Sequence, residues 1–221
     1  MIDVLYCLEK GNRLNFDNEI ILSIRSLLKF GNPNRIFIAG SISQRVLKLS
    51  DKIIHIEHRN PNGTKSFKIA HRIATVCKNT DISDDFIWFA DDYILTQKVD
   101  LSKYPHYISG NLGNTKIQNA YSYFKINTHK YLTELGFTSD NFDCHTPIIY
   151  NKEKFLEIFR EHHNAGKMLL VKSTYANILG VKGILTNDSK VDKSGVNSVI
   201  SLSDNNHSNL LKRINLILSK E

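Results

Sequence analysis

Short apolar runs alternate with amphipathic segments over the first 95 residues of the chain. The runs predict buried β-strands, and the segments, whose apolar residues recur every three or four positions, predict helices. Because strands and helices alternate, we predict an α/β fold with a mostly parallel central sheet and helices on both faces. The predicted strands cover residues 2–8, 35–39, 52–56 and 86–90, and the predicted helices cover residues 17–30, 43–49 and 65–78.

The pattern is less regular after residue 95. The stretch 186–208 is rich in Asn, Ser, Asp and Lys, which predicts a mobile flap or linker. From residue 208 onward, apolar residues at helical spacing predict an amphipathic C-terminal helix. The other predicted elements are helices over 117–135, 152–161 and 172–179 and a strand over 148–150.

The composition narrows the class of protein. A net charge of +7 favours anionic partners such as nucleotides, nucleic acid or acidic glycans. The cysteines, Cys7, Cys77 and Cys144, are odd in number and widely spaced, so we expect neither a disulfide framework nor a structural zinc site. The sequence has no long apolar window and no basic segment before its first strand, so we expect no membrane helix and no signal peptide. The cysteine pattern favours a reducing, cytoplasmic location.

The most informative segment is DDFIWFADDYIL, residues 84–95, in which five consecutive apolar residues end on Asp91 and Asp92. The exit of a buried parallel strand is where an open α/β sheet presents its ligand crevice. Paired carboxylates suit Mg²⁺ or Mn²⁺, and these ions usually share such ligands with substrate phosphates. The alternative interpretation is a solvated turn that only ends the strand.

Several motifs in a fixed order resemble a known family. They are DNEIILSIRSLLKFG and RIFIAG (within 17–40), FIWFADDYIL (86–95) and CHTPIIYNKEKF (144–155). The layout resembles the conserved regions of Stealth proteins, which are nucleotide-sugar-dependent sugar-phosphate transferases of capsule and lysosomal-targeting pathways. It is also similar to small glycosyltransferase-like proteins of tailed bacteriophages. The resemblance covers roughly residues 1–180.

The chain departs from the family at the acidic strand end. Stealth proteins carry Asn-Asp-Asp there, whereas this chain has Ala90-Asp91-Asp92 and no Asp-x-Asp triplet. Which of the two carboxylates contacts a metal ion therefore stays open.

The resemblance implies a GT-A-like, three-layer fold of nucleotide-diphospho-sugar transferases. It also implies a nucleotide-sugar donor, with a UDP-sugar favoured, and Mn²⁺ or Mg²⁺ held by Asp91 and Asp92, with Asp92 counted among the catalytic residues. A divalent ion that bridges both phosphates stabilises the leaving nucleoside diphosphate in the transition state.

Three further residues are expected on the donor side of such a site. Lys65 follows Asn62-Gly63-Thr64 at a predicted helix start, where helix N–H groups and a lysine charge both favour phosphate. An ordinary solvated lysine is the alternative. Tyr6 and Leu8, at the end of the first strand, are expected as walls for the nucleotide base, although Tyr6 also fits a plain core position.

Asp143 and His145 are the candidate catalytic residues on the acceptor side. His145 lies in a His-x-Pro segment just before a predicted strand, where it can bind metal, hydrogen-bond a phosphate or act as a general base. A structural histidine is the simpler alternative. Asp143 is the competing base, able to deprotonate an acceptor hydroxyl if the reaction inverts the anomeric centre.

We predict one GT-A-like domain, 1–221, that consists of three parts. Residues 1–95 form the half that binds the nucleotide-sugar, residues 96–185 form the acceptor-side half, and residues 186–221 form the polar segment and the C-terminal helix.

Three functions remain open from the sequence. The first is a metal-dependent glycosyltransferase whose acceptor is a hydroxyl, either on a hydroxymethylated base of phage DNA or on a glycan. DNA would require base flipping. The second is a Stealth-type sugar-1-phosphate transferase that acts on a glycan. The third is a module that binds nucleic acid or glycan without turnover.

Overall fold

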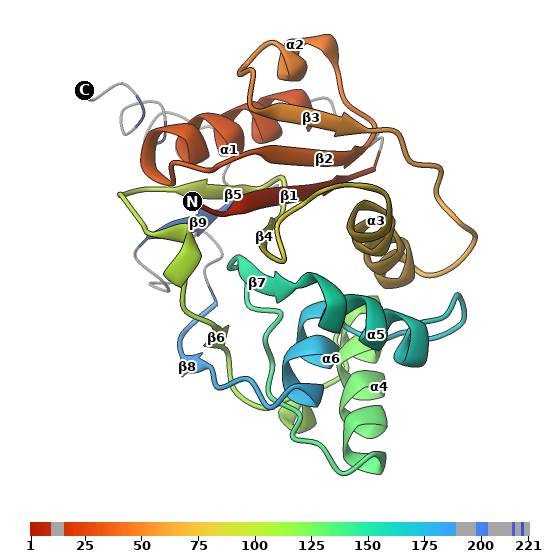
Figure 1. Ribbon diagram of the computed structural model, residues 1–221. Coiled ribbons are helices and arrows are strands. Elements are labelled where there is room, and N and C mark those ends of the chain that lie inside the picture. The colour runs from red at the N-terminus through yellow and green to blue at the C-terminus, as the bar shows by residue number, and fades with distance from the viewer. Residues whose placement is uncertain (10–15, 189–197, 203–213, 215–217, 219–221) are drawn as a thin grey trace.

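A computed structural model describes residues 1–9, 16–188, 198–202, 214 and 218 (Figure 1). Within these ranges no helix has both the length and the hydropathy needed to cross a bilayer. The elements are β1 (Asp3–Leu8), α1 (Phe16–Phe30), β2 (Ile36–Gly40), α2 (Gln44–Leu47), β3 (Ile53–Ile56), α3 (Lys65–Asn79), β4 (Asp85–Phe89), β5 (Tyr93–Leu95), β6 (Tyr107–Ile108), α4 (Ala120–Glu134), β7 (Ile148–Asn151), α5 (Lys152–His162), α6 (Val171–Ile178), β8 (Ile184–Leu185) and β9 (Val199–Ser201), with 3₁₀ turns η1 (Leu101–Lys103) and η2 (Leu112–Asn114).

The central sheet has five strands in the order β3-β2-β1-β4-β7. β1 to β4 pair in parallel, and β7 pairs antiparallel to β4. The predicted α/β fold with a mostly parallel sheet is therefore confirmed. The chain adds β2 and β3 on one side of β1 and then crosses to add β4 on the other side. The carboxyl ends of β1 and β4 thus flank the topological switch point, where open α/β sheets bind their ligands.

The sheet separates two cores because alternate side chains of each strand point to opposite faces. In β1, Val4 and Tyr6 pack with apolar residues of α1. Leu5, between them, packs on the opposite face with residues of α3, α5 and α6. These two cores give the three layers, with α1 on one face of the sheet and α3 and α5 on the other (Figure 1).

Helix α4 begins at residue 120 rather than at the predicted 117 because its capping residue is Asn119. The Asn119 side chain accepts a hydrogen bond from the backbone N–H of Ser122, and the Ser122 hydroxyl accepts one from the backbone N–H of Asn119. This reciprocal capping box fixes the start of the helix.

The stretch 186–208, predicted to be a mobile flap or linker, contains a strand. β9 lies within it and pairs antiparallel with β5, so the prediction is wrong for these residues. The short pair β6 and β8 was also not predicted. The predicted C-terminal helix lies largely outside the described residues, of which only Ile214 and Leu218 belong to it.

Candidate functional site

The acid pair lies in a tight turn between β4 and β5. The backbone N–H of Tyr93 donates to the carbonyl of Ala90 at 3.2 Å, which closes the turn. The Asp92 carboxylate accepts a hydrogen bond of 2.7 Å from the Ser201 hydroxyl, and the Asp92 carbonyl accepts one of 3.0 Å from the backbone N–H of Leu202. Asp92 is therefore held in position by β9.

Tyr6 and Leu8 lie in the core and do not line the cavity described below. Tyr6 is fully buried, and its hydroxyl is 2.8 Å from the Ser23 hydroxyl of α1. Burial raises the pKa of Tyr6, and the negative charge of Asp91 raises it further. The chain that follows β1, residues 10–15, lies outside the described residues.

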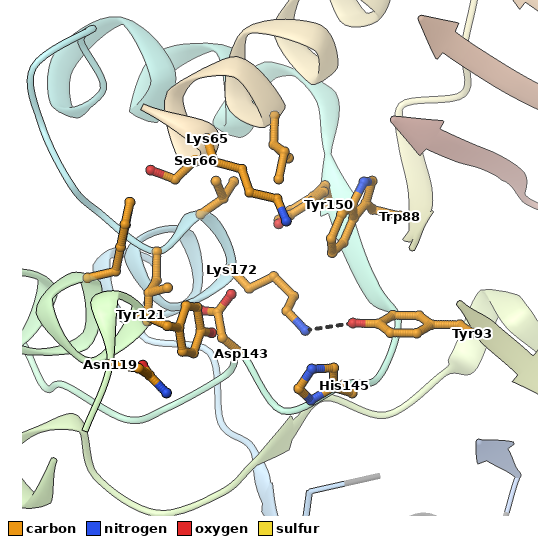
Figure 2. A pocket seen from close by; sticks show the side chains of 14 residues that line it. Lys65, Ser66, Trp88, Tyr93, Asn119, Tyr121, Asp143, His145, Tyr150 and Lys172 are labelled. Atoms are coloured by element: carbon orange, nitrogen blue, oxygen red, sulfur yellow. Dashed lines mark hydrogen bonds between the residues drawn. The ribbon is translucent and has the colours of Figure 1, made fainter. Parts of the chain in front are cut away.

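A cavity of about 430 Å³ opens beside the end of β4 (Figure 2). It lies on the face of the sheet that α3 and α6 cover, and α4 closes its far side. The lining residues are Lys65, Ser66, Ile69, Trp88, Tyr93, Asn119, Tyr121, Phe124, Asp143, His145, Tyr150, Leu170, Val171 and Lys172.

The first turns of three helices line this cavity: α3 through Lys65 and Ser66, α4 through Tyr121, and α6 through Val171 and Lys172. The first N–H groups of a helix have no partner within the helix, and the helix dipole adds positive potential at that end. At each of these ends a side chain already accepts from one N–H group: Thr64 at α3, Asn119 at α4 and Asp143 at α6. The two lysines are therefore the main groups of the cavity that favour a bound anion.

Lys172 is the least exposed charged side chain of the cavity, with only 3% of its surface accessible. Its ammonium group donates to the carbonyls of Thr146 (3.1 Å) and Cys144 (3.3 Å) and to the Tyr93 hydroxyl at 3.5 Å. It also lies 5.8 Å from the centre of the Trp88 ring. Among the described residues it forms no ion pair, although the Asp143 carboxylate lines the same cavity.

Asp143 and His145 both line the cavity, and each is held by a partner from a later segment. One Asp143 oxygen accepts hydrogen bonds from the backbone N–H (3.1 Å) and the hydroxyl (2.7 Å) of Ser173 in α6. Nδ1 of His145 is 2.6 Å from the Asp188 carboxylate. With a proton on Nδ1, Nε2 of His145 is the basic nitrogen, and it has no partner among the described residues.

The Tyr93 hydroxyl lies at the junction between the acid turn and the cavity. Burial raises the pKa of Tyr93 well above its usual range, and the nearby charges of Asp92 and Asp143 raise it further. The hydroxyl therefore stays protonated with Asp92 and Asp143 close to it. A substrate in the cavity would lie next to the acid turn.

The acid pair suits a metal ion that is shared with a substrate. No group of three or more His, Cys, Asp or Glu side chains within the described part of the chain is arranged to hold a metal ion. Mg²⁺ is usually bound by only one or two carboxylates, with water and substrate phosphates completing its shell. Asp91 and Asp92 fit a Mg²⁺ ion of this kind, held by two carboxylates together with water and substrate phosphates.

The cavity thus brings together Lys65, Asp143 and His145 of the predicted residues, with Asp91 and Asp92 in the adjoining turn. Sequence reasoning missed Lys172, which carries no motif. Its only signal is its position near the start of a predicted helix.

Comparisons with known proteins give fold similarities only. No protein-family model matches the chain, and no match is found among curated proteins. The chain is similar to the galactosyltransferase LgtC in complex with donor and acceptor sugar analogues, at 12% identity and a TM-score of 0.45, over 74% of this chain and 61% of that one. It is also similar to HddC from Yersinia pseudotuberculosis, at 14% identity and a TM-score of 0.41, over 82% of this chain and 100% of that one.

A third similar structure is the bifunctional glycosyltransferase WbbM, at 10% identity and a TM-score of 0.44, over 86% of this chain and 39% of that one. The chain spans about 60% of the length of LgtC. With TM-scores below 0.5, these similarities establish no activity for this chain.

Proposed function

We propose that this protein is a GT-A-like glycosyltransferase that moves a sugar from a nucleotide-diphospho-sugar, in the presence of a divalent metal ion, to an acceptor hydroxyl. The observation that carries the proposal is the acid turn at the carboxyl end of β4, beside the switch point of the sheet and next to a cavity of ligand size. A UDP-sugar remains the favoured donor because of the family resemblance.

On the donor side, Asp91 and Asp92 would hold Mg²⁺ or Mn²⁺ together with the diphosphate. The ion, when bound, would offset the negative charge that develops on the leaving nucleoside diphosphate. Ser201 fixes the orientation of Asp92 through its hydrogen bond. Lys65, which was expected on the donor side, lines the cavity instead.

On the acceptor side, His145 is the general base. Asp188 orients its ring and stabilises the imidazolium that forms when Nε2 takes the proton of the acceptor hydroxyl. Asp143 is less suited to this role because the Ser173 backbone N–H and hydroxyl both donate to one of its oxygens, so that oxygen is already engaged in hydrogen bonds. Asp143 instead positions the start of α6.

The acceptor can be a hydroxymethylated base of DNA or a glycan hydroxyl, and both belong in the first assays. A sugar-1-phosphate transferase of Stealth type would use the same donor but would add phosphate together with sugar to the acceptor. A module that only binds nucleic acid or glycan would show no turnover.

The first test is a thermal-shift series with nucleoside diphosphates and nucleotide-sugars, each with Mn²⁺ and with EDTA. A ligand at about 100 times its dissociation constant stabilises the native state by roughly 2.7 kcal/mol. We expect one nucleotide to raise the melting temperature with Mn²⁺ and to lose most of this effect in EDTA. A series without any nucleotide-dependent shift would contradict the proposal.

The matched variants are Asp91→Asn and Asp92→Asn, with Asp100→Asn as control. Asp100 is also a turn aspartate that accepts a serine hydrogen bond, but it lies outside the cavity. We expect Asp91→Asn and Asp92→Asn to lose the Mn²⁺-dependent rise in melting temperature and to lower turnover by about 100-fold or more. The control should retain both. Turnover that survives both substitutions would show that the acid pair holds no essential metal.

The mass of the product separates the two transferase reactions. Transfer of the sugar alone adds one glycosyl unit, whereas sugar-1-phosphate transfer adds a phosphate as well. Binding of DNA or glycan that is unchanged in both Asp variants, without any product, would support the binding module instead.

A further inference from the structure

Two features of this site attract anions, and they lie on different sides of the end of β4. The acid pair acts through a metal ion, and Asp92 is bonded to Ser201 of β9, a strand whose Val199 packs in the core on the α1 side. The cavity lies on the α3 and α6 side, next to Trp88, and neither Asp91 nor Asp92 lines it. If the diphosphate of the donor binds at the metal ion, the cationic cavity is left for a different group.

Lys172 is the main evidence that this group is an anion. Its ammonium group is almost completely removed from water and is held by two carbonyls and one hydroxyl, all of them neutral. A buried charge that forms no ion pair is unfavourable, and a bound anion would relieve that cost. Lys65 also reaches toward the cavity, so two ammonium groups face the single lining carboxylate, Asp143 (Figure 2).

Tyr150 provides an independent indication of a polar ligand. The residue is fully buried and lines the cavity, yet its hydroxyl has no hydrogen-bond partner in the described part of the chain. A buried hydroxyl without a partner is destabilising, and most such groups in folded proteins are satisfied. A ligand oxygen between Lys65 and Lys172 would be near this hydroxyl (Figure 2).

We infer that the cavity binds a second anionic group, a phosphate or carboxylate that is separate from the donor diphosphate and is carried by the acceptor or by the transferred sugar. Lys172 and Lys65 bind it, and the Tyr150 hydroxyl donates to it. This inference rests on the proposed function, since it assumes that the diphosphate binds at the acid turn.

The probe for the first test is inorganic phosphate, measured by calorimetry in EDTA. We expect phosphate to bind without a divalent ion, and to bind equally well when the protein is saturated with the nucleoside diphosphate and Mn²⁺. Nucleotide binding should depend on Asp91 and Asp92, and phosphate binding should not. The two sites are thereby tested separately.

Lys172→Met should weaken phosphate binding about tenfold or more, because a charge-assisted hydrogen bond is lost. Lys182→Met, just beyond the other end of α6, is the control and should leave the affinity unchanged. Because Lys172 is buried, Lys65→Met and Tyr150→Phe provide a second test in variants that keep the core packing. Each should weaken phosphate binding several-fold while nucleotide binding with Mn²⁺ is retained.

Competition between phosphate and the nucleotide would overturn the inference, because the cavity would then be the diphosphate site, while the proposed function would stand. Absence of phosphate binding, or equal binding by wild type and all three cavity variants, would also overturn it. If the wild-type protein binds no nucleotide with Mn²⁺, that result would instead contradict the proposed function.

Two further ligands identify the source of the anion. If the acceptor carries it, glucose 6-phosphate should bind to the nucleotide-saturated protein and should lose affinity in Lys172→Met. If the transferred sugar carries it, UDP-glucuronic acid should bind more tightly than UDP-glucose, and Lys172→Met should abolish the difference. If neither ligand depends on Lys172, the cavity does not recognise an anionic sugar.

Discussion

At the scale of single residues, burial sets the behaviour of the histidines on the α3 and α5 side of the sheet. His163, just after α5, has 9% of its surface exposed, and its ring stacks on Phe159. Its Nε2 has no hydrogen-bond partner among the described residues. Burial, followed by the nearby charges of His162 and Lys167, lowers the pKa of His163 to about 4.

This depressed pKa predicts acid instability. His163 is neutral in the folded protein down to about pH 4, whereas the unfolded chain takes up the proton near pH 6.5, so the stabilising contribution is complete above pH 6.5 and is lost as the pH falls toward 4. His163→Phe keeps an aromatic ring and removes the proton site. We compare the free energy of unfolding of the variant with that of wild type at each pH. Between pH 7.5 and pH 5 we expect this difference to shift by about 2 kcal/mol in favour of the variant.

Urea unfolding at the two pH values measures this effect. His129→Phe is the control, since His129 is partly exposed and its ring bonds to Ser139. An equal pH dependence of wild type and His163→Phe would show that His163 does not contribute to the acid instability.

The sequence predicted those site residues that stand in a local pattern. Asp91 and Asp92 end an apolar run, Lys65 begins an amphipathic helix, and His145 belongs to a motif. Lys172 had no such pattern, because its burial depends on β5 and on the carbonyls of residues 144 and 146, which only the folded chain brings together.

At the scale of elements, the close contact between β1 and β2 depends on one glycine. Gly40 ends β2 with φ of +117°, a conformation that residues with a side chain rarely adopt. A Cβ atom at this position would lie 1.9 Å from the carbonyl oxygen of Leu8. The two strands can therefore pair up to their carboxyl ends, beside the switch point, only because residue 40 lacks a side chain.

Gly40→Ala should destabilise the protein by roughly 3 kcal/mol, through backbone strain and the forced separation of β1 from β2. Gly136→Ala is the matched control: its φ is +81°, but no atom lies within 4 Å of the added Cβ, so about 1 kcal/mol is expected. Thermal or urea unfolding measures both. Equal losses would mean that β1 and β2 can separate without penalty.

The long elements were predictable because each carries its own periodic or continuous apolar pattern. The strands β5, β6, β8 and β9 have only two or three residues each. β5 and β9 form because distant segments pair, with Ile94 opposite Ile200, and no local pattern encodes such a partner. The polar composition of 186–208 therefore misled the sequence analysis.

At the scale of the whole molecule, the candidate site is assembled from both ends of the described chain. β1 and β4 supply the switch point, α3, α4 and α6 surround the cavity, and β9 holds the acid turn. The parallel strands β1 to β4 all come from the first 90 residues, whereas the orientation of Asp92 depends on β9, more than 100 residues further along the chain.

Ser201→Ala tests this dependence. Loss of the hydroxyl leaves Asp92 without one of its hydrogen bonds, and removal of such an orienting group typically weakens metal binding by about 10- to 100-fold. We expect weaker Mn²⁺ activation by about tenfold, with little change in overall stability. Ser102→Ala, which removes the hydroxyl that bonds to Asp100, is the control, and an unchanged Mn²⁺ titration in Ser201→Ala would contradict the role of β9.

The position of β9 in the sequence also determines that the sheet can form before the acid turn is oriented during synthesis of the chain. Ser201 follows Asp92 by 109 positions, and a ribosome that adds about 5–20 residues per second makes it on the order of 10 s later. The parallel strands of the nascent chain can pair in that interval, while the acid turn still lacks the strand that orients it. An unfinished chain is thereby expected to hold a sheet whose acid turn is not yet oriented, until translation has passed β9.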